Sequence, residues 1–358
     1  MKRHFVIVTH PHCDSEIPFE GIMAMKRWIT RHYTRLTAKH TIGDAGQRHR
    51  CFAALLAVMA VFLFGSPELP AQKHIVPVPE ITKTTLWDVC FSDAQHGIAV
   101  GDYGVIQRSV DGGRSWKPKK SKDQLAFRNV HFFGKTQGIA CGFWSTMFIT
   151  DDGGDTWSKV DLHMQNHLPG FAAAGWGCLW ASGEKGVVLK STDRGRSWTK
   201  KQTDTQFILD AISFADSLHG WCSSVQGALF YTCDGGDTWQ KRLAPSKLPV
   251  TTIVARGPKE CWLGGFNGLV AASSDAGATW KIKPAYTINI QRMRFDTLGR
   301  GWAVGNRGAI IRSADGGETW DLFKLTDAGL INSIHFPDDT TIVAVGSAGT
   351  ILRIPVPH

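Results

Sequence analysis

The octapeptide Ser313-Ala-Asp-Gly-Gly-Glu-Thr-Trp320 decides the fold of this 358-residue chain, because it is the last of six copies of one motif. Each copy reads Ser/Thr-x-Asp-x-Gly-x-Ser/Thr-Trp, and successive copies begin 40 or 41 residues apart. A period near 40 residues is typical of repeat proteins built from blade-like units. The earlier copies are Ser109–Trp116, Thr150–Trp157, Ser191–Trp198, Thr232–Trp239 and Ser273–Trp280.

A tight hairpin turn recurs seven times at the same period. In the first repeat it is Gly101-Asp-Tyr-Gly104, with two residues between flanking glycines after a short apolar stretch. Together with the aspartate motif, this turn predicts four short strands, near 87–91, 97–101 and 105–109 and from Trp116 onward. Radially arranged four-stranded units form a β-propeller. We therefore predict an all-β fold, a seven-bladed β-propeller.

The seventh repeat lacks the aspartate motif and a fourth strand of its own. Counting back one period from Trp116 places Ile75-Val-Pro-Val-Pro79 in the register of the missing strand. Two prolines suit an outer edge strand, because one side of such a strand needs no N–H donor. We predict that this N-terminal strand completes the last blade and closes the ring, which removes the open ends of a linear array.

Residues 1–71 differ from the repeats and are predicted to form a basic N-terminal extension with a secretory signal, ahead of a propeller domain over 72–358. Arg48-His-Arg50 precedes a 14-residue apolar run, Cys51–Phe64, and small residues follow it. The run is shorter than the roughly 20 residues of a membrane-spanning helix, although a membrane anchor remains an alternative. We expect an exported protein of the periplasm or cell envelope. A start at Met23 or Met25 would shorten the basic segment to an ordinary length.

Composition excludes several other classes of site. The formal net charge is +9, but no Lys/Arg cluster is interleaved with aromatic residues, so we expect no nucleic-acid partner. No complete metal-ligand or cofactor motif is present, and we expect neither a metal nor a cofactor. Six cysteines follow residue 71, mostly at repeat positions that otherwise hold small apolar residues, which indicates buried thiols and leaves disulfide pairing open.

The repeated aspartates are predicted to be structural. Each carboxylate can accept backbone N–H groups within the turn between the third and fourth strands. A propeller has one axial site, so six aspartates at equivalent positions of six blades do not converge on one reaction centre. These residues are Asp111, Asp152, Asp193, Asp234, Asp275 and Asp315.

The motif matches the Asp-box, or BNR repeat, of sialidases and related propellers. Residues 75–354 resemble the photosystem II assembly and stability factor family, as the near-regular stretch Gly301–Trp320 illustrates. The resemblance implies an exported, non-enzymatic seven-bladed propeller that acts in the assembly of a membrane complex. In a photosynthetic host it implies the thylakoid lumen as the location.

Successive turns of antiparallel strands alternate between two faces of the ring. The hairpins between the second and third strands share one face, here called the hairpin face, with the links between blades. Exposed aromatic residues beside arginines suit a protein-binding surface, whereas the alternative is that the aromatics fold over neighbouring blades and the arginines are merely solvated. The predicted partner-binding residues are Tyr103, Arg128, Phe143, Trp144, Lys185, Asp210, Phe266, Arg292, Arg294 and Arg307.

Two functions follow for comparison. The first is a monomeric, non-enzymatic scaffold or assembly factor that binds a membrane protein or membrane complex through one face. The second is a sialidase-like glycoside hydrolase, which would need convergent arginines and a tyrosine nucleophile supported by a carboxylate. Asp88 and Asp210 are the plausible axial acids, and they lie three blades apart. With no complete catalytic site, the sequence favours the first function. The tyrosines available after the signal are Tyr103, Tyr231 and Tyr286.

Overall fold

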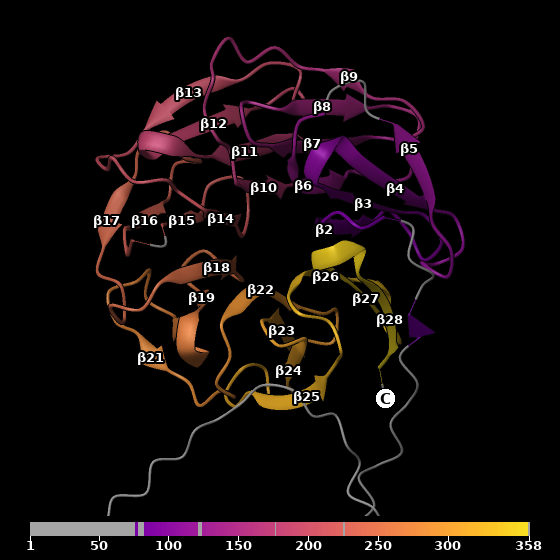
Figure 1. Cartoon of the computed structure of the whole chain (residues 1–358). Coiled ribbons are helices and arrows are strands. Elements are labelled where there is room, and N and C mark those ends of the chain that lie inside the picture. Colours follow the sequence, from indigo (N-terminus) through magenta and orange to yellow (C-terminus); the bar gives the residue numbers. More distant parts are fainter. Residues whose placement is uncertain (1–75, 78–81, 121–123, 176, 225, 357–358) are drawn as a thin grey trace, which may run out of the picture. The chain divides into compact units, whose positions relative to one another are not determined.

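The computed structural model describes residues 76–77, 82–120, 124–175, 177–224 and 226–356. These residues form seven antiparallel sheets of four strands each. Figure 1 shows the sheets arranged radially about a central axis, with the first strand of each sheet innermost. First strands of neighbouring sheets contact each other all the way round, including β2 with β26. The predicted all-β, seven-bladed propeller is confirmed.

The blades follow the chain in order. Blade 1 comprises β2 (Leu86–Phe91), β3 (Gly97–Gly101), β4 (Val105–Ser109) and β5 (Lys117–Lys120). Blade 2 comprises β6 (Phe127–Phe132), β7 (Gly138–Gly142), β8 (Met147–Thr150) and β9 (Ser158–Lys159). Blade 3 comprises β10 (Gly170–Ala174), β11 (Cys178–Ser182), β12 (Val187–Ser191) and β13 (Thr199–Gln202). Blade 4 comprises β14 (Ala211–Phe214), β15 (Gly220–Ser223), β16 (Leu229–Thr232) and β17 (Gln240–Arg242). Blade 5 comprises β18 (Val250–Ala255), β19 (Cys261–Gly265), β20 (Val270–Ser273) and β21 (Lys281–Ile282). Blade 6 comprises β22 (Ile290–Phe295), β23 (Gly301–Gly305), β24 (Ala309–Ser313) and β25 (Asp321–Leu325), and blade 7 contains β26 (Ile331–Asp338), β27 (Thr341–Gly346) and β28 (Ile351–Pro355).

Burial falls from the inside of each blade to its rim. The second strands, such as β3 (Gly-Ile-Ala-Val-Gly), are buried on both faces because neighbouring blades pack against them. The fourth strands are polar and largely exposed, as in β13 (Thr-Lys-Lys-Gln). Each fourth strand begins just after the motif tryptophan rather than at it, as Lys117 shows in blade 1. The six propeller cysteines are unpaired, and Cys90, Cys141, Cys222 and Cys261 are buried.

Blade 7 takes its outer strand from the other end of the chain. β1 (Val76–Pro77) pairs antiparallel with β28, with Val76 opposite Arg353 and Pro77 opposite Leu352. The predicted closure of the ring by an N-terminal strand is thus confirmed. No helix within the described ranges has the length and apolar character needed to cross a membrane. The predicted signal and extension over 1–71 lie outside the described residues, and these domain boundaries stay a prediction.

Removing the closing strand should destabilise the whole ring. A chain lacking residues 1–81 would leave the β28 edge unpaired, whereas a chain lacking residues 1–71 keeps β1 and serves as the control. We expect the shorter chain to melt about 5 °C lower, since a few kcal/mol shift Tm by that order in a domain of this size. Calorimetry measures the shift, and gel filtration reports association through the open edge. Equal melting temperatures would contradict the closure.

Candidate partner-binding site

The Asp-box turns hold their aspartates in local hydrogen bonds. In blade 1, Asp111 Oδ1 accepts the Ser115 amide at 2.9 Å, and Ser109 Oγ accepts the Gly113 amide at 2.9 Å. Hydrogen bonds from the Thr279 hydroxyl and amide and from Ser273 lower the pKa of Asp275 to about 2. The six carboxylates therefore act within six separate turns.

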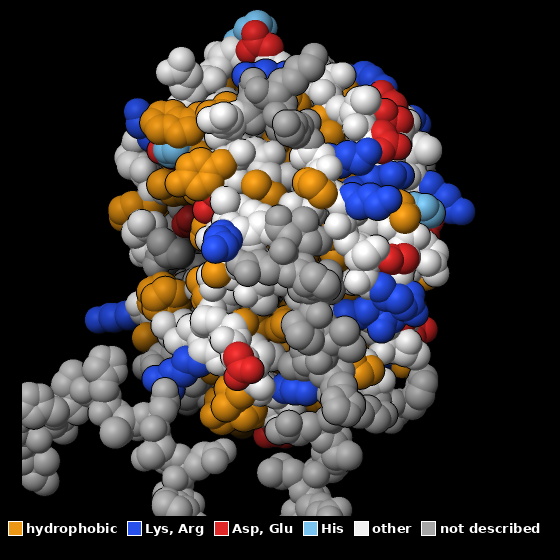
Figure 2. Space-filling model, turned by 45° about the vertical axis from the view of Figure 1, so that its right-hand side comes forward, with side chains coloured by type: hydrophobic (Ala, Val, Ile, Leu, Met, Phe, Trp, Pro, Cys, Tyr) orange, Lys and Arg blue, Asp and Glu red, His pale blue; other side chains and the backbone are white. Residues whose placement is uncertain are grey.

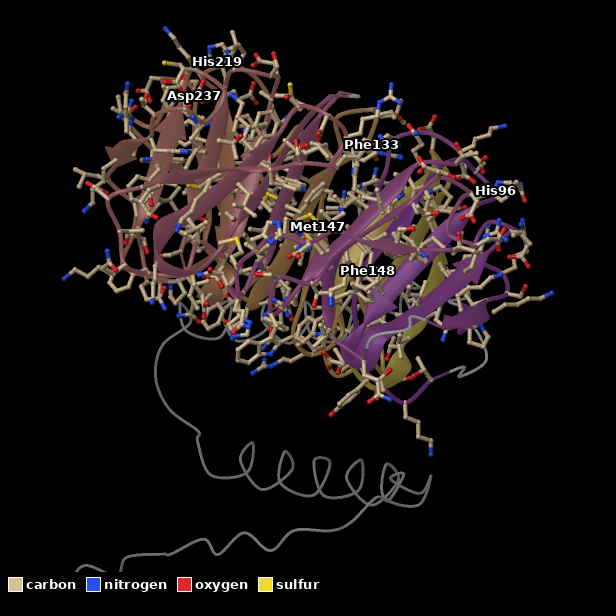
Figure 3. The ribbon with its side chains drawn as sticks, turned by 90° about the horizontal axis from the view of Figure 1, so that it is seen from above. His96, Phe133, Met147, Phe148, His219 and Asp237 are labelled. Carbon is tan, nitrogen blue, oxygen red and sulfur yellow. The ribbon has the colours of Figure 1, made fainter. Side chains whose placement is uncertain are left out.

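The two faces of the ring carry different turns. Figure 3 shows His96 and His219, from turns between first and second strands, and Asp237, from an Asp-box turn, along one edge of the ring. This edge is called the Asp-box face. The opposite, hairpin face carries the η turns, such as η1 (Asp102–Gly104). Hydrophobic side chains reach the surface beside Lys and Arg side chains on the side drawn in Figure 2.

Hairpin tips hold non-glycine residues in the left-handed region. Tyr103 has φ 55° and Trp144 has φ 56°, and the two residues are 72 % and 61 % exposed. A bulky residue with this backbone conformation is disfavoured by about 1–2 kcal/mol. Large aromatic side chains are thus solvent-exposed at positions where glycine or asparagine would adopt the left-handed backbone with less strain.

An aromatic strip runs across blades 1 and 2 and the link that follows. It consists of Trp87, Arg128, Phe143, Trp144 and His167. The Arg128 guanidinium lies over the Trp87 ring, 3.8 Å from its centroid, and 5.5 Å from that of Phe143. The His167 ring centroid lies 5.0 Å from that of Phe143 and 4.5 Å from that of Trp144. Burial and the nearby Arg292 lower the pKa of Arg128 to about 10, so the guanidinium remains charged at neutral pH.

Seven side chains, one from each blade, surround the axial channel where it opens on the hairpin face. They enclose a cavity of about 110 Å³, into which Arg292 also reaches. Of the predicted site residues, Arg128, Asp210 and Arg292 meet here. The seven residues are Trp87, Arg128, Pro169, Asp210, Thr251, Gln291 and Asn332.

Arg294 lies deeper than the other predicted residues. Positions two apart in a strand share a face, so Arg294 and Arg292 of β22 both point into the channel, where a second cavity of about 380 Å³ opens. Asp88, which the sequence indicates as a plausible axial acid, lines this second cavity together with His131 and His335, which were not predicted. Along the first strands, their positions alternate with the buried apolar positions, and this alternation is the sequence signal that could have identified them.

The remaining predicted residues stand on other blades. Lys185 and Arg307 are exposed hairpin-tip residues of blades 3 and 6, and Phe266 of blade 5 is 37 % exposed. The Lys185 carbonyl accepts a hydrogen bond from Gln202 Nε2. The structure therefore joins Arg128, Phe143 and Trp144 in one strip, with Tyr103 next to the Asp102 carboxylate that accepts the Trp87 indole N–H at 2.7 Å.

These observations define an Asp-box β-propeller with an aromatic and arginine-bearing hairpin face. A family model, described as photosynthesis system II assembly factor YCF48, matches residues 72–201 and 197–284. These matches cover more than half of the chain, and the chain belongs to this family.

The curated relatives match shorter stretches. The chain is 30% identical over 112 residues to the photosystem II stability/assembly factor HCF136, chloroplastic, of Oryza sativa subsp. japonica, covering 29% of this chain and 26% of that protein. It is 31% identical over 93 residues to the photosystem II assembly lipoprotein Ycf48 of Synechococcus sp. (strain CC9902), covering 25% of this chain and 27% of that one. The match thus spans about a quarter of the length of each relative.

Solved structures agree in fold over most of the chain. YCF48 bound to D1 peptide superposes with a TM-score of 0.65 at 22% identity, covering 80% of this chain and 96% of that one. YCF48 from Cyanidioschyzon merolae gives 0.65 at 21% identity, covering 78% and 98%. The WD40 propeller domain of Doa1 gives a TM-score of 0.67 at 11% identity, covering 81% of this chain and 98% of that one. A TM-score of this size is therefore evidence for the fold alone.

Two channel histidines should make stability depend on pH. Burial and the charge of Arg294 lower the pKa of His131 to about 4 and that of His335 to about 3, from an ordinary value of 6.5. The unfolded chain then binds more protons below about pH 6.5, so stability should fall as the pH drops from there toward 4. A His131→Gln/His335→Gln variant should show a shallower fall in urea midpoint between pH 7 and 4.5. Exposed His163→Gln is the control, and a slope unchanged in the double variant would contradict the assignment.

Proposed function

We propose that this protein is a non-enzymatic assembly factor that binds a membrane protein or membrane complex through its hairpin face. The observation that carries the proposal is the aromatic strip, in which exposed Trp144 stands beside the stacked Arg128 and Phe143. Tryptophan, tyrosine and arginine are the residues that contribute most binding energy in protein interfaces. A protein partner fits this surface better than a nucleic acid, whose phosphates need clustered cations.

The strip is arranged before any partner arrives. Arg128 already stacks on Trp87, and Trp87 is fixed by its hydrogen bond to Asp102. Side chains that are ordered in the free protein lose little conformational entropy on binding, so more of the buried apolar area contributes to affinity. Trp144, held at a hairpin tip, offers a large and rigid contact for a pocket or an apolar segment of the partner.

The family supports a role in assembling a membrane complex. One solved relative is YCF48 bound to D1 peptide, and both curated relatives are named as photosystem II assembly factors. In a photosynthetic host we propose photosystem II assembly from the lumenal side, and in another host a complex of the cell envelope. The basic flank and apolar run over 48–64, together with relatives named as a lipoprotein and as chloroplastic, support export. We propose a monomer, because within the described residues each of the seven blades has its four strands from this chain and the ring closes without a second copy.

The geometry favours binding over glycoside hydrolysis. The Tyr231 hydroxyl donates to the Pro258 carbonyl at 2.9 Å within the packed core of blades 4 and 5, away from both axial cavities. Asp88 and Asp210 line different cavities, and both Asp88 oxygens already accept hydrogen bonds. Within the described ranges, no tyrosine lines either axial cavity. The tyrosine and carboxylate pair of a sialidase therefore has no counterpart there.

The test is capture of a partner from gently solubilised membranes of the native host. A Phe143→Ala/Trp144→Ala/Phe266→Ala variant should recover at least about tenfold less of the membrane complex than the natural protein, since aromatic anchors carry much of such binding energy. Leu218→Ala/Leu298→Ala removes exposed apolar side chains from turns of the Asp-box face and should leave recovery unchanged. Equal recovery by both variants would place the contact elsewhere on the molecule.

A further inference from the structure

The larger axial cavity has chemistry of its own. It occupies about 380 Å³ of the channel between the first strands, a size that suits a small organic molecule. One part of its wall is polar and includes Arg292 and Arg294. Another part is aromatic and includes Phe171, Phe295 and Phe336, with Phe214 nearby in the lining. A molecule with a charged end and an apolar body would meet both parts of the wall.

The two guanidinium groups have donors left over. Arg292 Nη2 donates to Asn129 Oδ1 at 3.3 Å, which is a long hydrogen bond. The Nη2 atoms of Arg292 and Arg294 lie 3.9 Å and 3.6 Å from Asp88 Oδ1, beyond ordinary hydrogen-bond distance. Among the described residues, neither arginine Nε finds an acceptor. Because these Nε atoms are buried, the donors that remain for a ligand are those of the Nη groups.

Asp88 is held away from the arginines by other bonds. Its Oδ1 accepts the Ser333 hydroxyl of blade 7 at 2.5 Å, and its Oδ2 accepts the Val130 amide of blade 2 at 3.1 Å. The Asp88 side chain is only 4 % exposed, whereas 29 % of Arg292 and 33 % of Arg294 remains accessible. The carboxylate thus ties three blades together, while the guanidinium groups face the cavity.

The charges in the cavity do not cancel. Two arginines face one aspartate, and burial keeps His131 and His335 neutral by lowering their pKa values. Burial also lowers the pKa of Arg292; Asp88 opposes this effect and Arg294 adds to it. An excess of one positive charge in a shielded site is unfavourable until an anion neutralises it. A monoanion balances the site, whereas a dianion such as hydrogen phosphate would reverse its charge.

We propose that the axial channel binds a small organic monocarboxylate, whose carboxylate meets the guanidinium groups of Arg292 and Arg294 while its apolar body lies against Phe171, Phe295 and Phe336. Guanidinium and carboxylate groups match in charge and in planar geometry. This site lies deeper in the channel than the mouth that Trp87 and Arg128 of the aromatic strip line, and Arg292 reaches both cavities. The inference goes beyond the proposed binding of a membrane protein and does not depend on it.

The experiment uses the full chain and three probes. Phenylacetate carries the charge and an aromatic body, phenylacetamide keeps the body without the charge, and inorganic phosphate carries charge without the body. Phenylacetate should raise the melting temperature in a saturable way, because a ligand that binds only the folded state stabilises it. Phenylacetamide should produce no saturable rise, and phosphate should produce a smaller rise than phenylacetate because it lacks the apolar body. Equal rises with phenylacetamide, or no binding of phenylacetate by calorimetry, would overturn the proposal.

Variants locate the binding within the channel. Arg292→Gln and Arg294→Gln should each weaken phenylacetate binding by about tenfold or more, since each removes a charge-assisted contact. Arg294→Lys keeps the charge without the planar pair of donors, so its affinity for phenylacetate should lie between those of the natural protein and Arg294→Gln. Arg114→Gln, on an exposed Asp-box turn and outside the lining of both axial cavities, is the control and should bind as the natural protein does. Affinity is compared only among variants that retain the near-ultraviolet circular dichroism of the folded ring, and unchanged affinity in both glutamine variants would overturn the proposal.

Discussion

The contact on which the rest of this structure depends joins the Asp-box turn of each of blades 1 to 6 to the second strand of the blade before it in the ring. The second glycine of the turn sits on one side chain of that strand, so closely that a Cβ on Gly317 would lie 2.3 Å from Trp262 Cη2. These glycines also have positive φ, as with 109° at Gly317, so both space and backbone conformation require glycine. The same contact crosses the ring closure, where Gly113 lies against Val343. The aspartate and its hydrogen bonds hold the turn in shape, and the turn fixes how one blade meets the next.

Because these contacts repeat, the first strands are brought to the axis in one register, and the residues that differ among blades are gathered there. One such position places Trp87 and Arg128 side by side at the mouth, and the next inward places Asp88 and Arg292 in the channel. The repeat thus separates two tasks within each blade. Its motif residues hold the ring, and its variable residues give the axis and the hairpin face their chemistry. Recognition needs no insertion into the repeats.

The fold could be predicted almost completely from the sequence, because period, turn chemistry and closure all depend on spacing. The sequence also predicted Arg128 and Asp210 on the hairpin face, and the structure brings them together at the mouth of the channel. The sequence did not predict how individual side chains turn. Phe143 and Trp144 are adjacent, yet Phe143 packs beside Arg128 and is half-buried, while Trp144 stands in water. That difference depends on the left-handed backbone at Trp144 and on the position of His167, which no periodicity specifies.

Charge distinguishes the two axial cavities more sharply than shape does. At the mouth, the Arg128 guanidinium is attracted by Asp210 and Asp102 and rests on an aromatic ring, so that its charge is largely accommodated by the protein itself. Deeper in, Asp88 is committed to Ser333 and Val130, and two arginines exceed the one carboxylate. An uncompensated charge in a shielded site lowers stability, and a ring held by repeated inter-blade contacts can tolerate this loss at one place. The free protein carries this loss of stability, and a bound anion removes it by neutralising the charge. The energy recovered in this way contributes to the affinity for the anion.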